Sequence, residues 1–226
     1  MDKPNLKLIY FKLRALAETP KMMMEFAGLK YSYIMAEDYF KKPWEKAKDD
    51  VPFNQLPLLI VNETTEIWQS NSIVRFLAPL TGTIPDDRLM AAQADSIFES
   101  THELFFPLNP TVNVVTGEQH KALKKQFLEM FPRKLKNFSR QFKRLSDGPF
   151  FFGDKPYYCD FSAYHHFSLA KILDPEVLNG YSRVTSFMKA FEKLPKVDEY
   201  LEKRPEIIDV GTNPKLIING IKYETG

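Results

Sequence analysis

The stretch that decides the fold is FNQLPLLIVNETTEIWQSNS, residues 53–72. Within it, residues 56–61 form an apolar run of strand length, and a turn with a second short strand follows up to Trp68. Ser70 is a residue type preferred at helix N-caps, so we expect it to cap a helix over residues 71–80. Two strands that lead directly into a helix indicate an α/β layer.

The residues before this stretch extend the same pattern. They predict strands over 6–11 and 31–35, a helix over 15–27 that stops at Gly28, and a short helix over 44–49. The resulting order, β-α-β-α-β-β-α, predicts a small domain over residues 1–80 with helices packed on a mixed sheet.

Strand signals end after Gly82, and a linker over residues 81–85 leads into a second domain over 86–226. Helical periodicity there predicts only helices, so the fold class is α/β followed by all-α. The residues from Asn213 onward read as an irregular tail. The expected helices span residues 86–106 (with breaks at Pro107 and Pro110), 118–145, 158–172, 184–193 and 195–203.

Composition excludes several classes of protein. Thirty-one Lys and Arg against 29 Asp and Glu leave a net charge of +2, which argues against nucleic acid or an anionic membrane as partner. No run of apolar residues has the length of a membrane span. The single cysteine, Cys159, excludes an intrachain disulfide framework and fits a reducing compartment, so we expect a cytoplasmic protein. The adjacent His165 and His166 do not share a helix face, and no metal is expected.

Three features of the first domain point to a ligand. Tyr10 ends the first strand, at the edge where α/β folds place ligands. The pair Gln69-Ser70 stands at a helix start, where free N–H groups suit a carboxylate. A cis bond between Leu56 and Pro57 would turn the backbone of Leu56 outward, where it could pair with an extended peptide.

Together these residues resemble a known family. The patterns that carry the resemblance are Tyr10-Phe11-x-x-Arg14-x-x-x-Glu18, the segments 53–59 and 68–73, and the segment 153–161, GDKPYYCDF. They are similar to the tyrosine-type cytosolic glutathione S-transferases, closest to the sigma class with a mu-like feature near residues 172–175, and span residues 5 to about 205. The resemblance implies a thioredoxin-like domain, an all-helical domain and a homodimer.

The resemblance also implies a function and its residues. It implies a detoxification enzyme that joins glutathione, its co-substrate, to small hydrophobic electrophiles, without a metal. Tyr10 would stabilise the thiolate, with Arg14 beside it in the catalytic centre. The implied glutathione-binding residues are Trp44, Lys48, Gln55, Leu56, Pro57, Gln69, Ser70 and, from a partner subunit, Glu103. The implied electrophile pocket contains Phe11, Leu13, Leu16, His102, Phe106 and Ile217.

Two departures from the family pattern keep alternatives open. Leu16 replaces a second arginine near the sulfur, and Tyr157 replaces the Ser or Thr of a helix-capping box. A non-catalytic, ligand-binding or crystallin-like member of the same fold is therefore the alternative function. A module of a translation factor is a third reading, which the short sequence after the helical domain disfavours.

Overall fold

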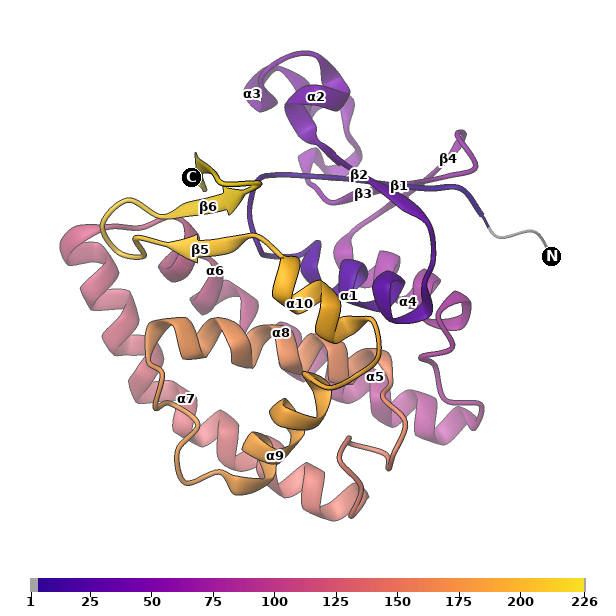
Figure 1. Cartoon of the computed structure of the whole chain (residues 1–226), viewed down its shortest axis with the longest axis vertical. Helices are drawn as coiled ribbons and strands as arrows, with labels where there is room; N and C mark the ends of the chain where they lie inside the picture. Colours follow the sequence, from indigo (N-terminus) through magenta and orange to yellow (C-terminus); the bar gives the residue numbers. More distant parts are fainter. Residues whose placement is uncertain (1–3, 226) are drawn as a thin grey trace.

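The computed structural model describes residues 4–225 and contains a four-stranded sheet near its N-terminus (Figure 1). The strands are β1 (Leu6–Tyr10), β2 (Tyr31–Met35), β3 (Leu58–Val61) and β4 (Thr65–Trp68), in the order β2-β1-β3-β4. β1 pairs parallel with β2 and antiparallel with β3, which pairs antiparallel with β4. All four residues of β3 are buried, as expected for a strand covered on both faces.

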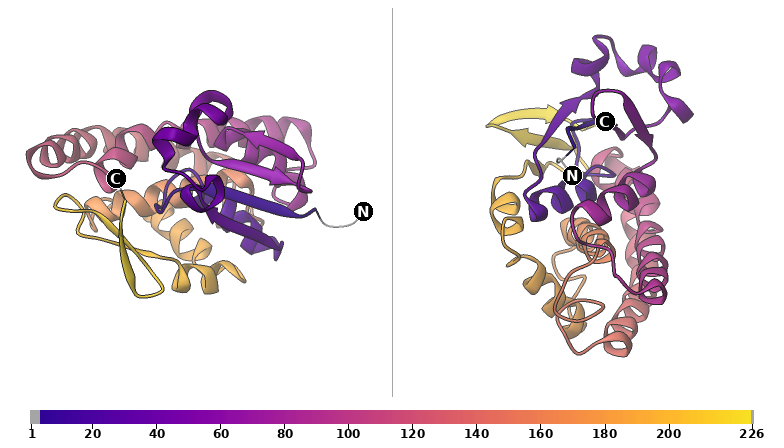
Figure 2. Two further views of the ribbon diagram at one scale, coloured as in Figure 1. Left: turned by 90° about the horizontal axis from the view of Figure 1, so that it is seen from above. Right: turned by 90° about the vertical axis from the view of Figure 1, so that its right-hand side faces the viewer.

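Helices cover both faces of this sheet. α1 (Glu18–Ala27) and α4 (Ser70–Leu80) pack against each other on the side that faces the helical domain. The short helices α2 (Ala36–Phe40) and α3 (Trp44–Ala47) lie on the opposite side (Figures 1 and 2). Two single 3-10 turns, Lys48–Asp50 and Pro52–Asn54, lead from α3 to β3.

The second half of the chain is helical and built around α8. Its helices are α5 (Arg88–His102), α6 (Phe105–Asn113), α7 (Gly117–Leu145), α8 (Tyr158–Leu173), α9 (Ser182–Phe191) and α10 (Val197–Lys203). α8 is buried along most of its length, and its Phe167 packs between Phe131 of α7 and Phe187 of α9. The predicted fold class, a thioredoxin-like domain followed by a helical domain, is confirmed.

The capping of α8 explains how the chain accommodates Tyr157 there. The carboxylate of Asp160 accepts the backbone N–H groups of Tyr157 at 2.8 Å and of Phe151 at 3.1 Å. Tyr157 itself makes no side-chain cap hydrogen bond. The acidic half of the capping box is therefore present, and the turn is held without a hydroxyl at its first position.

The prediction of an irregular tail after Asn213 is wrong. β5 (Glu206–Ile208), β6 (Lys215–Ile218) and β7 (Ile221–Glu224) form an antiparallel sheet in that order, which we call the C-terminal sheet. Asn219 and Gly220 have φ of 50° and 78°, as a two-residue hairpin turn with right-handed strand twist requires. An Asn-Gly pair between two apolar runs is a hairpin signal that the helical reading overlooked.

Other element boundaries also differ from the prediction. The helix expected over residues 86–106 ends at His102, and α6 runs through Pro107 and Pro110 instead of breaking there. Pro107 occupies the first turn of α6, where a backbone N–H has no partner within the helix, so proline is tolerated. α4 begins at Ser70 itself, with Gln69 at the N-cap, so Ser70 is not the capping residue.

Candidate active site

Tyr10, the last residue of β1, presents a buried hydroxyl. Its side chain is 4% exposed, and its oxygen accepts the backbone N–H of Leu16 at 3.3 Å. Burial raises the pKa of Tyr10, and the bond from Leu16 opposes this only in part. The phenol therefore keeps its proton at neutral pH, and no described residue accepts that proton. The Tyr10 hydroxyl is thus a fixed hydrogen-bond donor without an acceptor among residues 4–225.

The start of α4 forms the second part of the site. Gln69 has a positive φ of 66°, and its amide donates to the Gln55 side chain at 3.0 Å. The Ser70 hydroxyl is buried and makes only a 3.5 Å contact with Asn71 Oδ1. Because Ser70 does not cap the helix, its hydroxyl and the first-turn N–H groups are available to an anion.

The segment before β3 joins this group. The peptide bond between Leu56 and Pro57 is cis, the isomer that would turn the Leu56 backbone outward. Leu56 is buried, and the Gln55–Gln69 hydrogen bond ties this segment to the start of α4. The pairing of Leu58 with Trp68 keeps the two segments side by side. The structure thus brings together Gln55, Leu56, Pro57, Gln69 and Ser70.

Trp44 and Lys48 lie on the other border of the site. The Trp44 ring packs edge-on against Phe11, with ring centroids 5.2 Å apart, and Phe11 in turn lies 5.3 Å from Tyr10. Through Phe11, Trp44 therefore packs against the loop that follows β1. Lys48 is exposed, and its Nζ is held by Glu45 at 2.7 Å. Side-chain packing thus supports a site position for Trp44, whereas Lys48 is engaged elsewhere.

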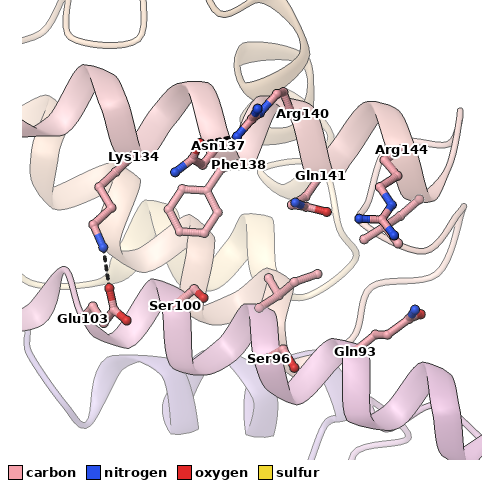
Figure 3. Close-up of a pocket in the computed structure, with 12 residues that line it drawn as sticks. Gln93, Ser96, Ser100, Glu103, Lys134, Asn137, Phe138, Arg140, Gln141 and Arg144 are labelled. Atoms are coloured by element: carbon pink, nitrogen blue, oxygen red, sulfur yellow. Dashed lines mark hydrogen bonds and ion pairs between the residues drawn. The ribbon is translucent and has the colours of Figure 1, made fainter.

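Glu103 does not join the residues around Tyr10. It forms an ion pair with Lys134 and lines a groove of about 540 Å³ between α5 and α7 (Figure 3). Phe138, Ile97 and Leu145 contribute apolar surface to this groove. Within one chain, Glu103 therefore lines the groove between α5 and α7 and lies apart from the residues around Tyr10.

The predicted electrophile pocket is divided among several cavities. Leu16 and His102 line a very small cavity with Ser70, of about 10 Å³. Phe106 is 72% exposed and lines a separate cavity of about 200 Å³ with Pro107 and Pro110. These side chains line separate cavities because Leu16 lies in the turn before α1, His102 ends α5 and Phe106 belongs to α6. One pocket that holds all of them stays a prediction.

Phe11 and Leu13 line two adjoining cavities next to the C-terminal sheet. The smaller, of about 200 Å³, is walled by Leu216 and Ile218 of β6, and we call it the C-terminal cavity. The larger, of about 430 Å³, includes Trp44 and Thr225. Alternation along a strand puts Leu216 and Ile218 on one face, whereas the predicted Ile217 points to the other. The sequence prediction missed these strand residues because it left the tail irregular.

Arg14 belongs to a buried cluster of charges. It is 8% exposed, and its guanidinium donates no hydrogen bond to any described residue. Burial lowers the pKa of Arg14, and repulsion by Arg204 adds to this while Glu18 opposes it. Burial alone would raise the pKa of Glu18, but attraction to Lys21, Arg204 and Arg14 lowers it. The oxygens of Glu18 lie 3.3 Å from both Lys21 Nζ and Arg204 Nη1.

The described residues show neither a metal-binding cluster nor a membrane-spanning helix. No group of three or more His, Cys, Asp or Glu side chains in residues 4–225 is arranged to hold a metal ion. In the same range, no helix is long and apolar enough to cross a membrane.

Comparison with known proteins assigns the family. The family models for the N-terminal and C-terminal domains of glutathione S-transferase match residues 6–79 and 107–204. Glutathione S-transferase Mu 1 of Macaca fascicularis is 30% identical over 203 residues, covering 85% of this chain and 88% of the relative. Mu 5 of Mus musculus is 29% identical over 209 residues, covering 89% and 90%.

A solved structure agrees with these relatives. The pi-class glutathione S-transferase of Onchocerca volvulus superposes with a TM-score of 0.77 at 25% identity, covering 88% of this chain and 93% of that one. The curated relatives carry the mu designation, so the expected closeness to the sigma class stays a prediction. From its two domains, its site geometry and these similarities, this chain belongs to the glutathione S-transferase family.

Proposed function

We propose that this transferase conjugates glutathione to small apolar electrophiles, with the Tyr10 hydroxyl donating a hydrogen bond to the glutathione sulfur. The observation that carries the proposal is the buried Tyr10 hydroxyl, whose proton no described residue accepts. The N–H of Leu16 fixes its oxygen at 3.3 Å and makes the hydroxyl a stronger donor. The names of the relatives favour this catalytic function over the non-catalytic alternative.

One hydrogen bond has the right strength for this task. A free thiol has a pKa of ~8.5 and is only slightly ionised at neutral pH. Lowering that pKa by ~2 units takes about 2.7 kcal/mol of preferential stabilisation of the thiolate. A hydrogen bond to a charged group contributes ~1.5–3 kcal/mol, so Tyr10 supplies most of the effect.

The remaining site residues hold the peptide part of glutathione. Gln69 and Ser70 would receive the γ-glutamyl carboxylate at the N-terminus of α4, and the Leu56 backbone, turned by Pro57, would pair with the cysteinyl part. Trp44, Lys48 and Gln55 would border the glycyl end. For this, Lys48 exchanges its ion pair with Glu45 for the glycyl carboxylate.

A homodimer in the cytoplasm is the second part of the proposal. Phe53 is 68% exposed, with a positive φ of 61°, and its ring lies 6.4 Å from that of the partly exposed Trp68. The groove between α5 and α7 offers apolar surface from Ile97, Phe138 and Leu145 on the same chain (Figure 3). Two copies related by a twofold axis would each bury Phe53 in the other's groove. Glu103 would then approach the partner's glutathione from that groove.

The Tyr10→Phe variant tests the catalytic proposal. With glutathione and 1-chloro-2,4-dinitrobenzene, we expect kcat/KM to fall by about 10- to 150-fold, which corresponds to ~1.5–3 kcal/mol. The glutathione Kd should stay within about twofold, because the hydroxyl acts on the sulfur and not on the peptide. The ultraviolet absorbance of the bound thiolate should appear at a higher pH in the variant than in the parent enzyme. An equal loss of activity and of glutathione binding would assign Tyr10 a structural role.

A further inference from the structure

The C-terminal cavity combines an apolar body with a cationic wall. Phe11, Leu13, Met35, Leu216 and Ile218 supply the apolar part. Side chains with positive charge line the remainder: Lys12, Arg14, Lys21, Lys203 and Arg204. The cavity adjoins the larger one, with which it shares Phe11, Leu13 and Met35, and so opens toward the loop that follows Tyr10.

The cations outnumber the carboxylates that pair with them. Glu18 is shared by Lys21 and Arg204 at 3.3 Å each, and Glu199 lies 3.7 Å from Lys203. Lys12 stacks over the Tyr223 ring of the C-terminal sheet at 4.7 Å, and no described carboxylate pairs with it or with Arg14. Five positive charges therefore face two negative ones, and the excess favours an anion.

Arg14 is the group that most needs such a partner. Arg14 as a whole is 8% exposed, its Nε is fully shielded from solvent, and its guanidinium donates no hydrogen bond to a described residue. Buried polar groups in native proteins are almost always hydrogen-bonded. A planar guanidinium also matches a carboxylate through two parallel hydrogen bonds.

We propose that the C-terminal cavity binds the carboxylate of the acceptor substrate, so that this enzyme prefers electrophiles whose small apolar body carries an anionic group. The proposal rests on the proposed transferase function and adds the substrate class. Size is consistent with it: a cavity of about 150 Å³ is known to hold benzene, and this one measures about 200 Å³. An apolar wall beside the cations favours an organic acid over a fully hydrated inorganic anion.

One wall of this cavity comes from outside the region that defines the family. The family model for the C-terminal domain ends at residue 204, whereas Leu216 and Ile218 belong to the C-terminal sheet. That sheet is held in place by the Thr225 hydroxyl, which donates to the Asn113 carbonyl at 2.6 Å. The Asn113 amide in turn donates to the Arg14 carbonyl at 3.5 Å. Asn113 thus links the C-terminal sheet to the backbone of Arg14.

Binding of unreactive probes gives the first test. On the full chain, calorimetry should show 3-nitrobenzoate binding at least ~10-fold more tightly than its uncharged methyl ester. Arg14→Met should abolish this preference, and Lys203→Met, at the exposed rim, should reduce it about threefold. Because the Arg14 guanidinium bonds to no described residue, its removal leaves no acceptor unpaired. Lys189→Met, an exposed lysine on α9, is the matched control and should change nothing.

Conjugation of a matched pair gives the second test. With 4-chloro-3-nitrobenzoate or its methyl ester, the thiolate forms the C–S bond, the C–Cl bond breaks, chloride leaves and the thiol proton goes to solvent. Each kcat/KM is divided by the rate constant of the uncatalysed reaction of the same compound. We expect this quotient to be at least ~10-fold larger for the acid than for the ester, and we expect the two quotients to become equal in Arg14→Met.

The outcomes separate the two proposals. If the acid binds preferentially but neither compound is conjugated, the transferase function fails and the substrate class falls with it, whereas anion binding by the cavity stands. If both compounds are conjugated and bound equally well, the transferase function stands and the proposed substrate class is overturned. Inorganic phosphate that binds as tightly as the acid would also overturn it, because the apolar wall would then contribute nothing.

Discussion

Replacing Ser70 with alanine asks whether its hydroxyl serves the fold or the ligand. Ser70 is the first residue of α4 and is 8% exposed, yet its hydroxyl makes only the 3.5 Å contact with Asn71. A capping serine contributes ~1 kcal/mol to stability, but Gln69 holds the capping position here. We therefore expect Ser70→Ala to lower the free energy of unfolding by less than ~1 kcal/mol, or Tm by less than about 3 °C.

The effect on glutathione binding should be larger. A hydroxyl that donates to the γ-glutamyl carboxylate contributes ~1.5–3 kcal/mol, so its loss should raise Kd roughly 10- to 150-fold. The first-turn N–H groups of α4 are backbone atoms and remain in the variant, so binding should weaken without vanishing.

Calorimetric titration with glutathione and thermal melts of the same samples separate the two roles. Ser72→Ala is the matched control, because Ser72 is exposed in the same helix and makes no side-chain hydrogen bond with a described residue. It should leave both Kd and Tm nearly unchanged. A Ser70→Ala protein that melts more than about 4 °C lower while its Kd stays within twofold would refute the proposed carboxylate site.

The remaining predictions concern assembly and acid stability. Light scattering should give twice the mass of one chain, and Phe53→Ser, which removes the exposed ring, should halve it; an unchanged mass would place the interface elsewhere. Burial lowers the pKa of His166 to about 4, against ~6.5 in an unfolded chain. The unfolded chain thus binds a proton that the folded chain excludes, and stability falls as the pH drops through this window. Denaturant titrations give the free energy of unfolding at about pH 7 and at about pH 4. Between these two pH values His166→Phe should lose ~3 kcal/mol less of this free energy than the parent chain, and equal losses would contradict the lowered pKa of His166.

The sequence predicted those elements whose signals are local. The apolar run at Leu58–Val61, the turn after it and the helix that follows were all found, because period and turn chemistry are encoded within a few residues of one another. Tyr10 and the Gln69-Ser70 pair were placed at the correct strand and helix ends for the same reason.

What the sequence did not predict depends on contacts between distant residues. Glu18 and Arg204 lie 186 residues apart and form their ion pair only after α10 docks on α1. The C-terminal cavity likewise needs the C-terminal sheet to meet the loop after β1. Phe106 and Leu13 are both apolar and near the expected site, but residue type does not reveal which cavity each side chain enters.

The position of the C-terminal sheet bears on how substrate preference can evolve. Leu216 is its buried anchor, whereas Ile218 is half-buried and Ile221 is 57% exposed. Substitutions at such exposed positions usually change stability by no more than ~0.5 kcal/mol. Leu216 packs into the buried core, whereas the half-buried Ile218 lines the C-terminal cavity at the edge of that core. Changes at Ile218 can therefore alter the size and charge of the cavity wall while the thioredoxin-like sheet stays intact. If the cavity binds the acceptor as we propose, selection acting on this hairpin can diversify the acceptor while the chemistry proposed for Tyr10 is inherited unchanged.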